Sequence, residues 1–338
     1  MDIAERLRHL VQLAHLSPEQ RELLASCATR RRFPAGARLL VEGEAGADTY
    51  LLESGRVRIQ RETPYGSFTL ATLGPGEIFG EASFIDQNAR SGDAVADSEC
   101  ELIVIDPAAL QTAMERDSSF AIALYWTFWK TLSKKLRKTN DTLTAFFTHT
   151  TRPPTPVPAA PRHPTGEFRV DMAAKRTLFQ EQRLSSMEIN FLSSLSQERK
   201  FQPGQLIFRE GEPGDAMWVV LEGRVMISKY IPGAGEEALA FLERGDYFGE
   251  MALIDHQPRS ADAKAHEVGA VCLAIPRDVV EGLLDIHRIT SLRLLRILCS
   301  LVAKRLREVD DKIVGWHILA AGGGADVTPP HFEDDPSV

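Results

Sequence analysis

The residues of this chain best suited to specific chemistry are a glutamate and an arginine at a fixed spacing, and the pair occurs twice. A Phe-Gly-Glu triplet at residues 79–81 is followed by Arg90, and the same triplet at residues 248–250 is followed at the same distance by Arg259. A guanidinium can form two parallel hydrogen bonds to a singly charged phosphodiester, a geometry that lysine lacks. An ionised glutamate accepts hydrogen bonds and suits a sugar hydroxyl. The pair therefore predicts a site for an anionic ligand that carries hydroxyl groups.

This spacing is part of a longer internal repeat, which must be settled before any secondary structure is assigned. The glycine pattern before the first triplet is found again 168 positions later. The matched segments are residues 33–36 with 201–204, 42–46 with 210–214, and 55–57 with 223–225. The triplets themselves lie 169 positions apart, so the second copy has gained one residue, which we place in the turn at residues 232–235. One ligand-binding unit is thus written twice.

The second copy resembles a known motif, since its residues 248–261 read Phe-Gly-Glu-Met-Ala-Leu-Ile-Asp-His-Gln-Pro-Arg-Ser-Ala. This run resembles the phosphate-binding cassette of cyclic nucleotide-binding domains. The first copy departs from it at Asn88, Ala89 and Gly92. The resemblance implies that the arginine binds the cyclic phosphate and that the glutamate accepts from the ribose 2′-hydroxyl. The residues after the glycine would form one helical turn with amides directed at the phosphate. The cassette candidates are Phe79, Gly80, Glu81, Ala82, Arg90 and Ser91, and Phe248, Gly249, Glu250, Met251, Arg259 and Ser260.

Base recognition is expected from the helix that follows each cassette. A resemblance to the bacterial catabolite activator protein family extends to residues 134–140, where that family's long helix places a polar pair over adenine. Thr139 and Asn140 match this pair, and Val309 and Asp310 take their place in the second repeat. An ordinary helix surface is an equally good interpretation of these four residues.

The residue after each arginine bears on the identity of the nucleotide. Ser91 and Ser260 stand where guanine-selective relatives often carry threonine, which favours cAMP over cGMP as the ligand. No cofactor and no metal are expected, because the histidines form no HxH pair of the kind that a metal-binding jelly roll requires. The chain is therefore not expected to be an enzyme.

Short strands must position these residues. Apolar and polar residues alternate over short segments bounded by Gly, Pro and Asp, which is typical of a sandwich or jelly-roll barrel. In the first repeat we expect strands at residues 38–41, 49–52, 56–60, 67–73, 94–96 and 100–105. The predicted fold class is mainly β with α. It comprises two β jelly-roll (double-stranded β-helix) cyclic nucleotide-binding domains, each flanked by helices and followed by a long C-terminal helix.

Helices are expected before and after each barrel. Ser17, followed by Pro18, predicts a capped helix ahead of the first barrel, and residues 185–189 take that part in the second repeat. After each barrel the apolar period changes from two to about 3.6, and a long helix is expected to begin near Pro107 or Pro276.

The apolar stripes of the long helices are too large for their own barrels. From residue 278 to residue 316 the second helix would be about 60 Å long at about 1.5 Å per residue, so it needs another helix to pack on. Either the two helices of one chain pair as a pseudo-dimer, or the second pairs with its twin in a homodimer, which we favour. A ligand could shift such helices through contacts that only one state makes.

Length and composition predict two domains in a cytoplasmic protein. The expected boundaries are residues 1–150 for the first domain with its long helix, 151–168 for a Pro-rich linker, 169–320 for the second domain with its long helix, and 321–338 for a disordered tail. The four cysteines form no CxxC pair, which indicates a reducing compartment. Neither a signal peptide nor a membrane span is expected.

The functional hypothesis is a cyclic-nucleotide sensor that regulates a partner protein through its long helices. DNA binding is not expected, because the net charge is −8 and the residues after the second long helix are too few for a helix-turn-helix. Residues 1–16 contain no Arg-Arg-x-Ser/Ala segment of the kind that protein kinase A regulatory subunits present. Two alternatives stay open: a scaffold protein with one or both pockets non-binding, and a nucleic-acid regulator that uses the basic helix faces.

Overall fold

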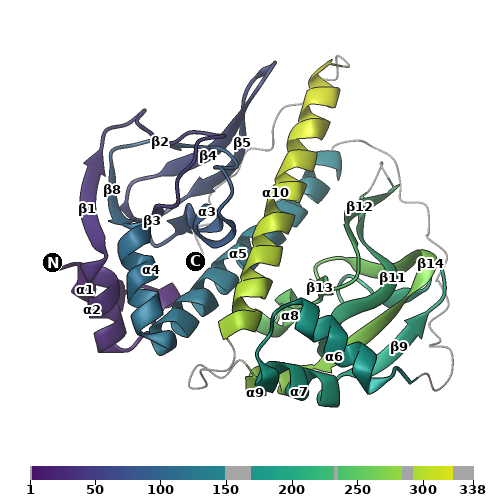
Figure 1. Cartoon of the computed structure of the whole chain (residues 1–338). Helices are drawn as coiled ribbons and strands as arrows, with labels where there is room; N and C mark the ends of the chain where they lie inside the picture. Colours follow the sequence, from purple (N-terminus) through teal and green to yellow (C-terminus); the bar gives the residue numbers. More distant parts are fainter. Residues whose placement is uncertain (1, 149–168, 232–234, 284–291, 323–338) are drawn as a thin grey trace. The chain divides into compact units, whose positions relative to one another are not determined.

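The computed structural model describes residues 2–148, 169–231, 235–283 and 292–322 (Figure 1). The chain forms two compact units, one made of Met1–Leu132 with Leu306–Val338 and the other of Ser133–Arg305. Each unit holds one barrel.

The first unit opens with the helices α1 (Ile3–Arg8), η1 (Val11–Leu13) and α2 (Pro18–Ser26). Ser17 caps α2, as the sequence predicts. Its Oγ accepts from the Gln20 amide at 3.2 Å, and Gln20 Oε1 accepts from the Ser17 amide at 3.0 Å. This reciprocal pair satisfies backbone amides that the start of a helix leaves free.

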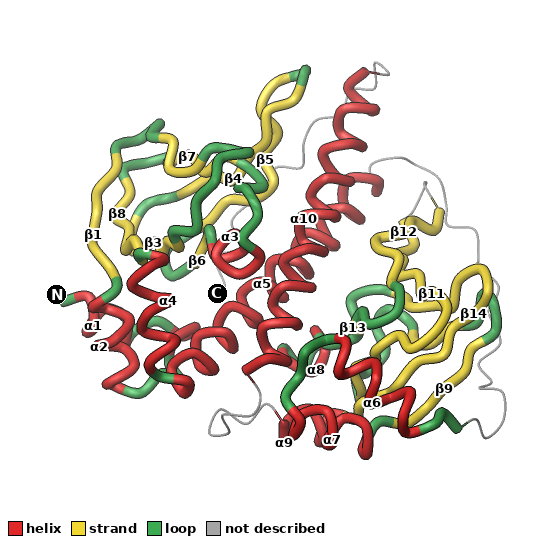
Figure 2. Tube along the Cα trace, in the orientation of Figure 1, coloured by secondary structure: helices red, strands yellow, loops and turns green. Residues whose placement is uncertain are grey.

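The first barrel consists of two four-stranded sheets, with the strand orders β1-β8-β3-β6 and β2-β7-β4-β5. Figure 2 shows its strands in yellow. Its strands are β1 Ala28–Phe33, β2 Arg38–Leu40, β3 Thr49–Ser54, β4 Val57–Thr63, β5 Gly66–Leu73, β6 Ile78–Phe79, β7 Asp93–Ala96 and β8 Cys100–Ile105. All their pairings are antiparallel. The strands expected from the sequence are confirmed, β1 and β6 are additional, and the jelly-roll prediction is confirmed.

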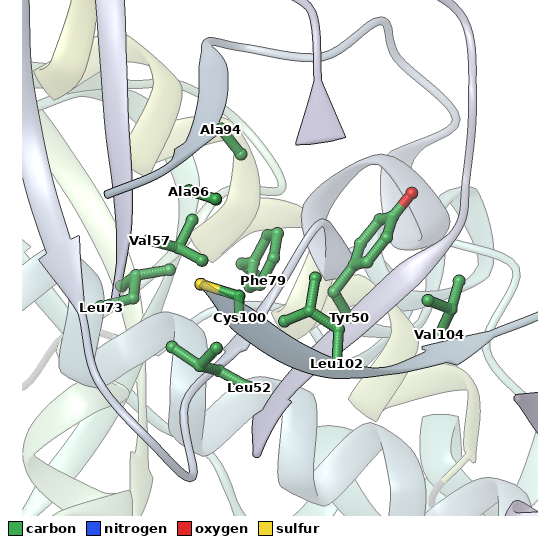
Figure 3. Close-up of a cluster of buried hydrophobic side chains, with 10 residues drawn as sticks. All are labelled: Tyr50, Leu52, Val57, Leu73, Phe79, Ala94, Ala96, Cys100, Leu102 and Val104. Atoms are coloured by element: carbon green, nitrogen blue, oxygen red, sulfur yellow. The ribbon is translucent and has the colours of Figure 1, made fainter. Parts of the chain in front are cut away.

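Buried apolar side chains from both sheets fill the first barrel (Figure 3). They are Tyr50, Leu52, Val57, Leu73, Phe79, Ala94, Ala96, Cys100, Leu102 and Val104. The rings of Tyr50 and Phe79 stack with their centroids 5.0 Å apart. Phe79 is the first residue of the Phe-Gly-Glu triplet, so packing in the core anchors the two residues that follow it.

The second unit repeats this plan with longer strands. Before its barrel lie α6 (Met172–Glu181) and α7 (Ser186–Leu195), and Ser185 caps α7 through a capping box with Glu188. Its strands are β9 Gln197–Phe201, β10 Leu206–Phe208, β11 Ala216–Ile231, β12 Gly235–Leu242, β13 Tyr247–Phe248 and β14 Asp262–Pro276. Because β11 and β14 each run through positions where the first barrel has two shorter strands, the second barrel's strands join into one sheet.

The helices after the first barrel differ from the predicted single helix. There α4 (Pro107–Arg116) ends at Asp117, whose backbone is extended, and α5 (Ser118–Thr148) follows. Asp117 Oδ1 accepts from the amides of Ser119 and Phe120 at 2.9 and 3.0 Å. This carboxylate binds the free amides at the start of α5, so the prediction that the long helix begins near residue 107 was wrong.

After the second barrel the structure describes α9 (Arg277–Leu283) and α10 (Leu292–Gly322). Residues 284–291, which the predicted continuous helix would cross, lie outside the described residues, as do the predicted linker and the turn at 232–234. Of the predicted tail, residues 323–338 also lie outside them, whereas α10 continues past residue 320 to Gly322.

Both long helices are divided between the units. Helix α5 belongs to the first unit as far as Leu132 and to the second from Ser133, whereas α10 belongs to the second as far as Arg305 and to the first from Leu306. Each unit therefore contains the end of the helix that follows the other barrel. Over the residues that the structure describes, none of the helices is both long and apolar enough to span a bilayer.

Candidate functional site

In the first cassette the glycine makes room for the arginine. Phe79 ends β6, Gly80 has a φ of +81°, and α3 (Glu81–Asp86) follows directly. A Cβ at Gly80 would lie 2.6 Å from the carbonyl oxygen of Asp48 and 3.0 Å from Arg90 Nη1. Both the positive φ and this close approach require glycine at the position.

Arg90 is held in the barrel by neutral acceptors. Its side chain donates from Nη1 to the Gly80 carbonyl and from Nη2 to the Asp48 carbonyl, each at 2.9 Å, and the residue is only 6% exposed. Loss of water on burial lowers its pKa, and nearby Tyr50 and Asp48 oppose that shift. A guanidinium stays protonated even so, so the barrel holds a buried positive charge.

The second cassette repeats this arrangement around Arg259, which is 4% exposed. Nη1 donates to the Gly249 carbonyl at 2.6 Å and Nη2 to the Ala216 carbonyl at 2.7 Å. Its guanidinium lies 4.3 Å from the centre of the Phe208 ring and 3.5 Å from Asp215 Oδ1. Burial lowers the pKa of Arg259 as well, with Asp215 opposing the shift.

The backbone of each arginine is fixed by the repeated Glu-Gly-Glu turn. The amide of Arg90 donates to the Glu44 carbonyl at 3.0 Å, and the Arg90 carbonyl accepts from the Gly43 amide at 2.9 Å. In the second unit Arg259 makes the matching pair of bonds with Glu212 and Gly211, at 2.8 and 2.9 Å. The glycine pattern that reveals the repeat in the sequence therefore serves to position the arginine.

Two polar atoms of the second cassette are buried without a hydrogen-bond partner among the described residues. They are Arg259 Nε, a donor, and Glu250 Oε2, an acceptor. Glu250 is 2% exposed, and its other oxygen, Oε1, accepts from Arg305 Nη1 at 3.0 Å. An unsatisfied polar group costs free energy when buried, typically about 1–3 kcal/mol. This site can therefore satisfy a ligand that brings both an acceptor and a donor.

The remaining cassette candidates lie in or beside a short helix, and their role in binding stays a prediction. Each glycine is followed by a short helix, α3 in the first unit and α8 (Met251–Ile254) in the second, which confirms the predicted helical turn. Ala82 lies in α3, and Glu81 is 1% exposed. Ser91 accepts through its carbonyl from Arg61 Nε at 2.5 Å, and the Ser260 hydroxyl lies 3.8 Å from Met251 Sδ.

The predicted base-binding residues of each long helix lie in a different unit from the cassette that precedes them in the sequence. Thr139 and Asn140 follow the first cassette in the chain but lie in the second unit, and Val309 and Asp310 follow the second cassette but lie in the first unit. Asn140 and Val309 are buried, and Asn140 Oδ1 has no hydrogen-bond partner among the described residues. The base-binding role of these four residues stays a prediction.

Three arginines of the long helices contact the cassettes and were not among the predicted site residues. Arg305 pairs with Glu250, Arg137 contacts Asp255, and Arg307 contacts three residues of the first cassette, namely Ser83, Asp86 and Ala89. The sequence signal that could have identified them is the basic run that lies just before each predicted base-binding pair, at residues 134–138 and 304–307.

No group of three or more His, Cys, Asp or Glu side chains within the described residues could hold a metal ion. All four cysteines are buried thiols, and loss of water raises the pKa of the Cys272 and Cys299 side chains.

Comparison with known proteins identifies the two barrels. The family model "cyclic nucleotide-binding domain" matches residues 30–117 and 198–287, together more than half of the chain. The cGMP-dependent protein kinase isozyme 2 of Drosophila melanogaster is 25% identical over 294 residues, which cover 84% of this chain and 22% of the kinase. The cyclic AMP receptor protein of Thermus thermophilus is 43% identical over 91 residues, which cover 27% of this chain and 42% of the receptor.

A solved structure with a similar extent is the regulatory domain of Toxoplasma gondii PKA, crystallised with cAMP. It is 20% identical, with 87% of this chain and 93% of that chain covered and a TM-score of 0.32. The chain spans less than half of the length of the two curated relatives named above.

Proposed function

Because the chain belongs to the cyclic nucleotide-binding domain family, we propose that each of its repeats binds one 3′,5′-cyclic nucleotide and that the chain passes this signal to a partner protein. Tandem domains of this family support the sensor role. We also propose the number of occupied sites, the identity of the nucleotide and the existence of a partner.

The observation that carries the proposal is the pair of unpartnered atoms in the second cassette. Arg259 Nε can donate to a phosphodiester oxygen, and Glu250 Oε2 can accept from a ribose 2′-hydroxyl. A 3′,5′-cyclic nucleotide carries both groups, with one negative charge on the phosphate and a free 2′-hydroxyl on the ribose. Its single charge matches one buried guanidinium.

Arg305 supports Glu250 in this role. The ion pair at 3.0 Å fixes one oxygen of the carboxylate, which leaves the other oriented for the ribose. In the first repeat, Arg90 and Glu81 take the corresponding roles, since Arg90 makes the same two carbonyl contacts as Arg259 and Glu81 is equally buried.

We favour cAMP as the nucleotide. Serine at residues 91 and 260, rather than threonine, supports this choice by resemblance. Because each long helix is divided between the units, we propose that each contacts the base bound by the other repeat's cassette. Thr139 and Asn140 would contact the nucleotide of the second cassette. Val309 and Asp310 would contact that of the first. The amide of Asn140 can pair with the edge of an adenine, which would satisfy its buried oxygen.

We propose that the output is a change in the long helices that a partner protein recognises, and that the chain acts as a homodimer. A ligand shifts such an equilibrium only through contacts that differ between two states, and base contacts by α5 and α10 would supply that difference. We propose that the chain itself is not an enzyme. The competing proposal is a scaffold protein with empty pockets.

Equilibrium dialysis of the purified chain against cAMP, cGMP and a cyclic dinucleotide separates these proposals. We expect saturable binding of cAMP that is tighter than binding of cGMP, and no binding of the dinucleotide. The absence of saturable binding by any of the three ligands at millimolar concentration would favour the scaffold. Preference for cGMP would refute the choice of nucleotide but not the sensor.

A further inference from the structure

Similar polar contacts are formed in both units between the C-terminal part of a long helix and the cassette or the barrel beside it. In the first unit the helix residues are Arg307 and Asp311 of α10, and in the second unit they are Arg137 and Asp141 of α5. The helix residues of the two units are 170 positions apart. In each unit the cassette belongs to one repeat, and the helix follows the cassette of the other.

Arg307 holds the first cassette with a charged fork. Its Nε donates to Asp86 Oδ2 at 2.9 Å and its Nη2 to Asp86 Oδ1 at 3.2 Å, while Nη1 donates to the Ala89 carbonyl at 2.8 Å. The side chains of Arg307 and Asp86 are only 16% and 8% exposed. Asp86 ends α3, and Ala89 precedes Arg90, so the fork spans the loop between the cassette helix and the arginine.

Arg137 contacts the second cassette at the matching positions. Its Nε donates to Asp255 Oδ2 at 2.9 Å, and its Nη1 donates to the Pro258 carbonyl at 3.0 Å. Asp255 follows α8 directly, and Pro258 precedes Arg259. The arginine therefore fixes the same two points of the loop in both units.

An acidic residue one turn later in each helix contacts the barrel beside the cassette. Asp311 accepts from Arg61 Nη1 at 2.5 Å, and Arg61 also donates to the Ser91 carbonyl at 2.5 Å and lies 3.4 Å from Glu42. In the first unit the loop that carries Arg90 is thus held directly on its N-terminal side and through Arg61 on its C-terminal side.

The second unit has the corresponding acidic contact. Asp141 accepts from Lys229 Nζ at 3.0 Å, and Lys229 lies 3.1 Å from Glu210. Lys229 and Glu210 each stand 168 positions after their counterparts in the first unit, Arg61 and Glu42. The arginine contact to the loop and the acidic contact to the barrel occur in both units although the two repeats differ at most positions, which supports a shared role.

We infer that Arg307 is a positioning residue for the nucleotide site of the first repeat and Arg137 for that of the second, so that each site is completed by the helix of the other repeat. The inference rests on the proposed nucleotide binding. Ionic hydrogen bonds at both ends of the loop hold the binding arginine in place before the ligand arrives. Displacement of either helix would weaken the nucleotide site whose loop that helix contacts. The affinity of each site therefore depends on the helix that follows the other repeat's cassette.

The test uses chains in which one nucleotide site is inactivated. In an Arg259→Ala background, which leaves the first site, we expect Arg307→Met to weaken cAMP binding about tenfold and Arg307→Lys to weaken it less, because lysine keeps the charge and loses the fork. In an Arg90→Ala background, which leaves the second site, Arg307→Met should change the affinity by less than about twofold, whereas Arg137→Met should weaken it about tenfold. Lys138→Ala, an exposed neighbour of Arg137, is the matched control.

Hydrogen exchange without nucleotide separates failure of this inference from failure of the proposed function. In the full chain, Arg307→Met should speed exchange over residues 83–90 and leave residues 252–259 unchanged, and Arg137→Met should do the reverse. Equal effects of both variants on both segments, or none on either, would overturn the inference. If the wild-type chain binds no nucleotide while exchange follows the expected pattern, the positioning contacts stand and the nucleotide proposal fails.

Charge reversal tests whether Asp86 and Arg307 pair directly, as opposed to each variant weakening the site by disturbing the fold. Asp86→Arg and Arg307→Asp should each weaken the first site, and the double variant should recover at least part of the loss, since the pair can form with its charges exchanged. A double variant that is as weak as the sum of the two single variants would contradict a direct pairing.

Discussion

Replacing Gly249 by alanine should damage the second nucleotide site far more than it damages the fold. A Cβ at this position would lie 2.5 Å from Arg259 Nη1 and 3.2 Å from the Phe208 ring, so the guanidinium must move by about an ångström to reach ordinary contact distance. That movement breaks or bends the hydrogen bond from Arg259 Nη1 to the Gly249 carbonyl, which is 2.6 Å long in the wild-type chain. A hydrogen bond to a charged group is worth about 1.5–3 kcal/mol.

Gly204→Ala is a closely matched control. Gly204 has a φ of +77° against +75° at Gly249, but nothing lies within 4 Å of its Cβ position. Both variants should therefore lose a similar stability, about 1–2 kcal/mol, because an L-residue is strained in this conformation. Only Gly249→Ala should also displace the arginine.

The assay is titration with cAMP in an Arg90→Ala background, alongside urea unfolding of each variant. We expect Gly249→Ala to weaken binding by about 10- to 100-fold, the range that corresponds to about 1.5–3 kcal/mol, and Gly204→Ala to leave it within about twofold. Equal affinities for the two alanine variants would refute the assignment of Arg259 to the phosphate.

Three further predictions concern stability and nucleic acid. Arg305→Met should leave the buried carboxylate of Glu250 without its ion-pair partner and reduce the free energy of unfolding by about 3 kcal/mol, measured in urea, whereas an unchanged midpoint would show that the pair contributes little. Desolvation lowers the pKa of His15 from its ordinary value of 6.5, so the unfolded chain binds a proton that the folded chain does not. The free energy of unfolding should thus fall as the pH drops below about 6.5, and His15→Gln should flatten this part of the profile. Gel shifts at physiological salt should show no sequence-specific DNA complex with or without cAMP, because the net charge is −8.

The cassettes could be predicted from the sequence because their geometry depends on local backbone requirements. Gly80 and Gly249 need a positive φ and space for a guanidinium, which few other residues tolerate. The capped start of α2 is equally local, since Ser17 and Gln20 satisfy one another within a single turn.

The features that escaped prediction depend on partners that lie far away in the chain. Strand β6 has only two residues and exists through its pairing with β3, and β1 carries mostly exposed side chains that show no alternation. The break at Asp117 comes from an aspartate that binds the amides of the next helix, although the apolar period continues through it.

The sequence also could not predict that each long helix is divided between the two units. An apolar stripe shows that a helix needs a partner but does not identify that partner. Arg137 and Arg307 read as ordinary basic residues of a helix surface until the structure places Asp255 and Asp86 opposite them. Which cassette each of these residues contacts depends on tertiary packing, which an apolar stripe does not reveal.

The stoichiometry of cAMP binding tests most directly whether both cassettes bind nucleotide through their arginines. Calorimetric titration of the wild-type chain should give two molecules of cAMP per chain, and Arg90→Ala and Arg259→Ala should each give one. The double variant should give none. A stoichiometry that stays the same in both single variants would contradict the account.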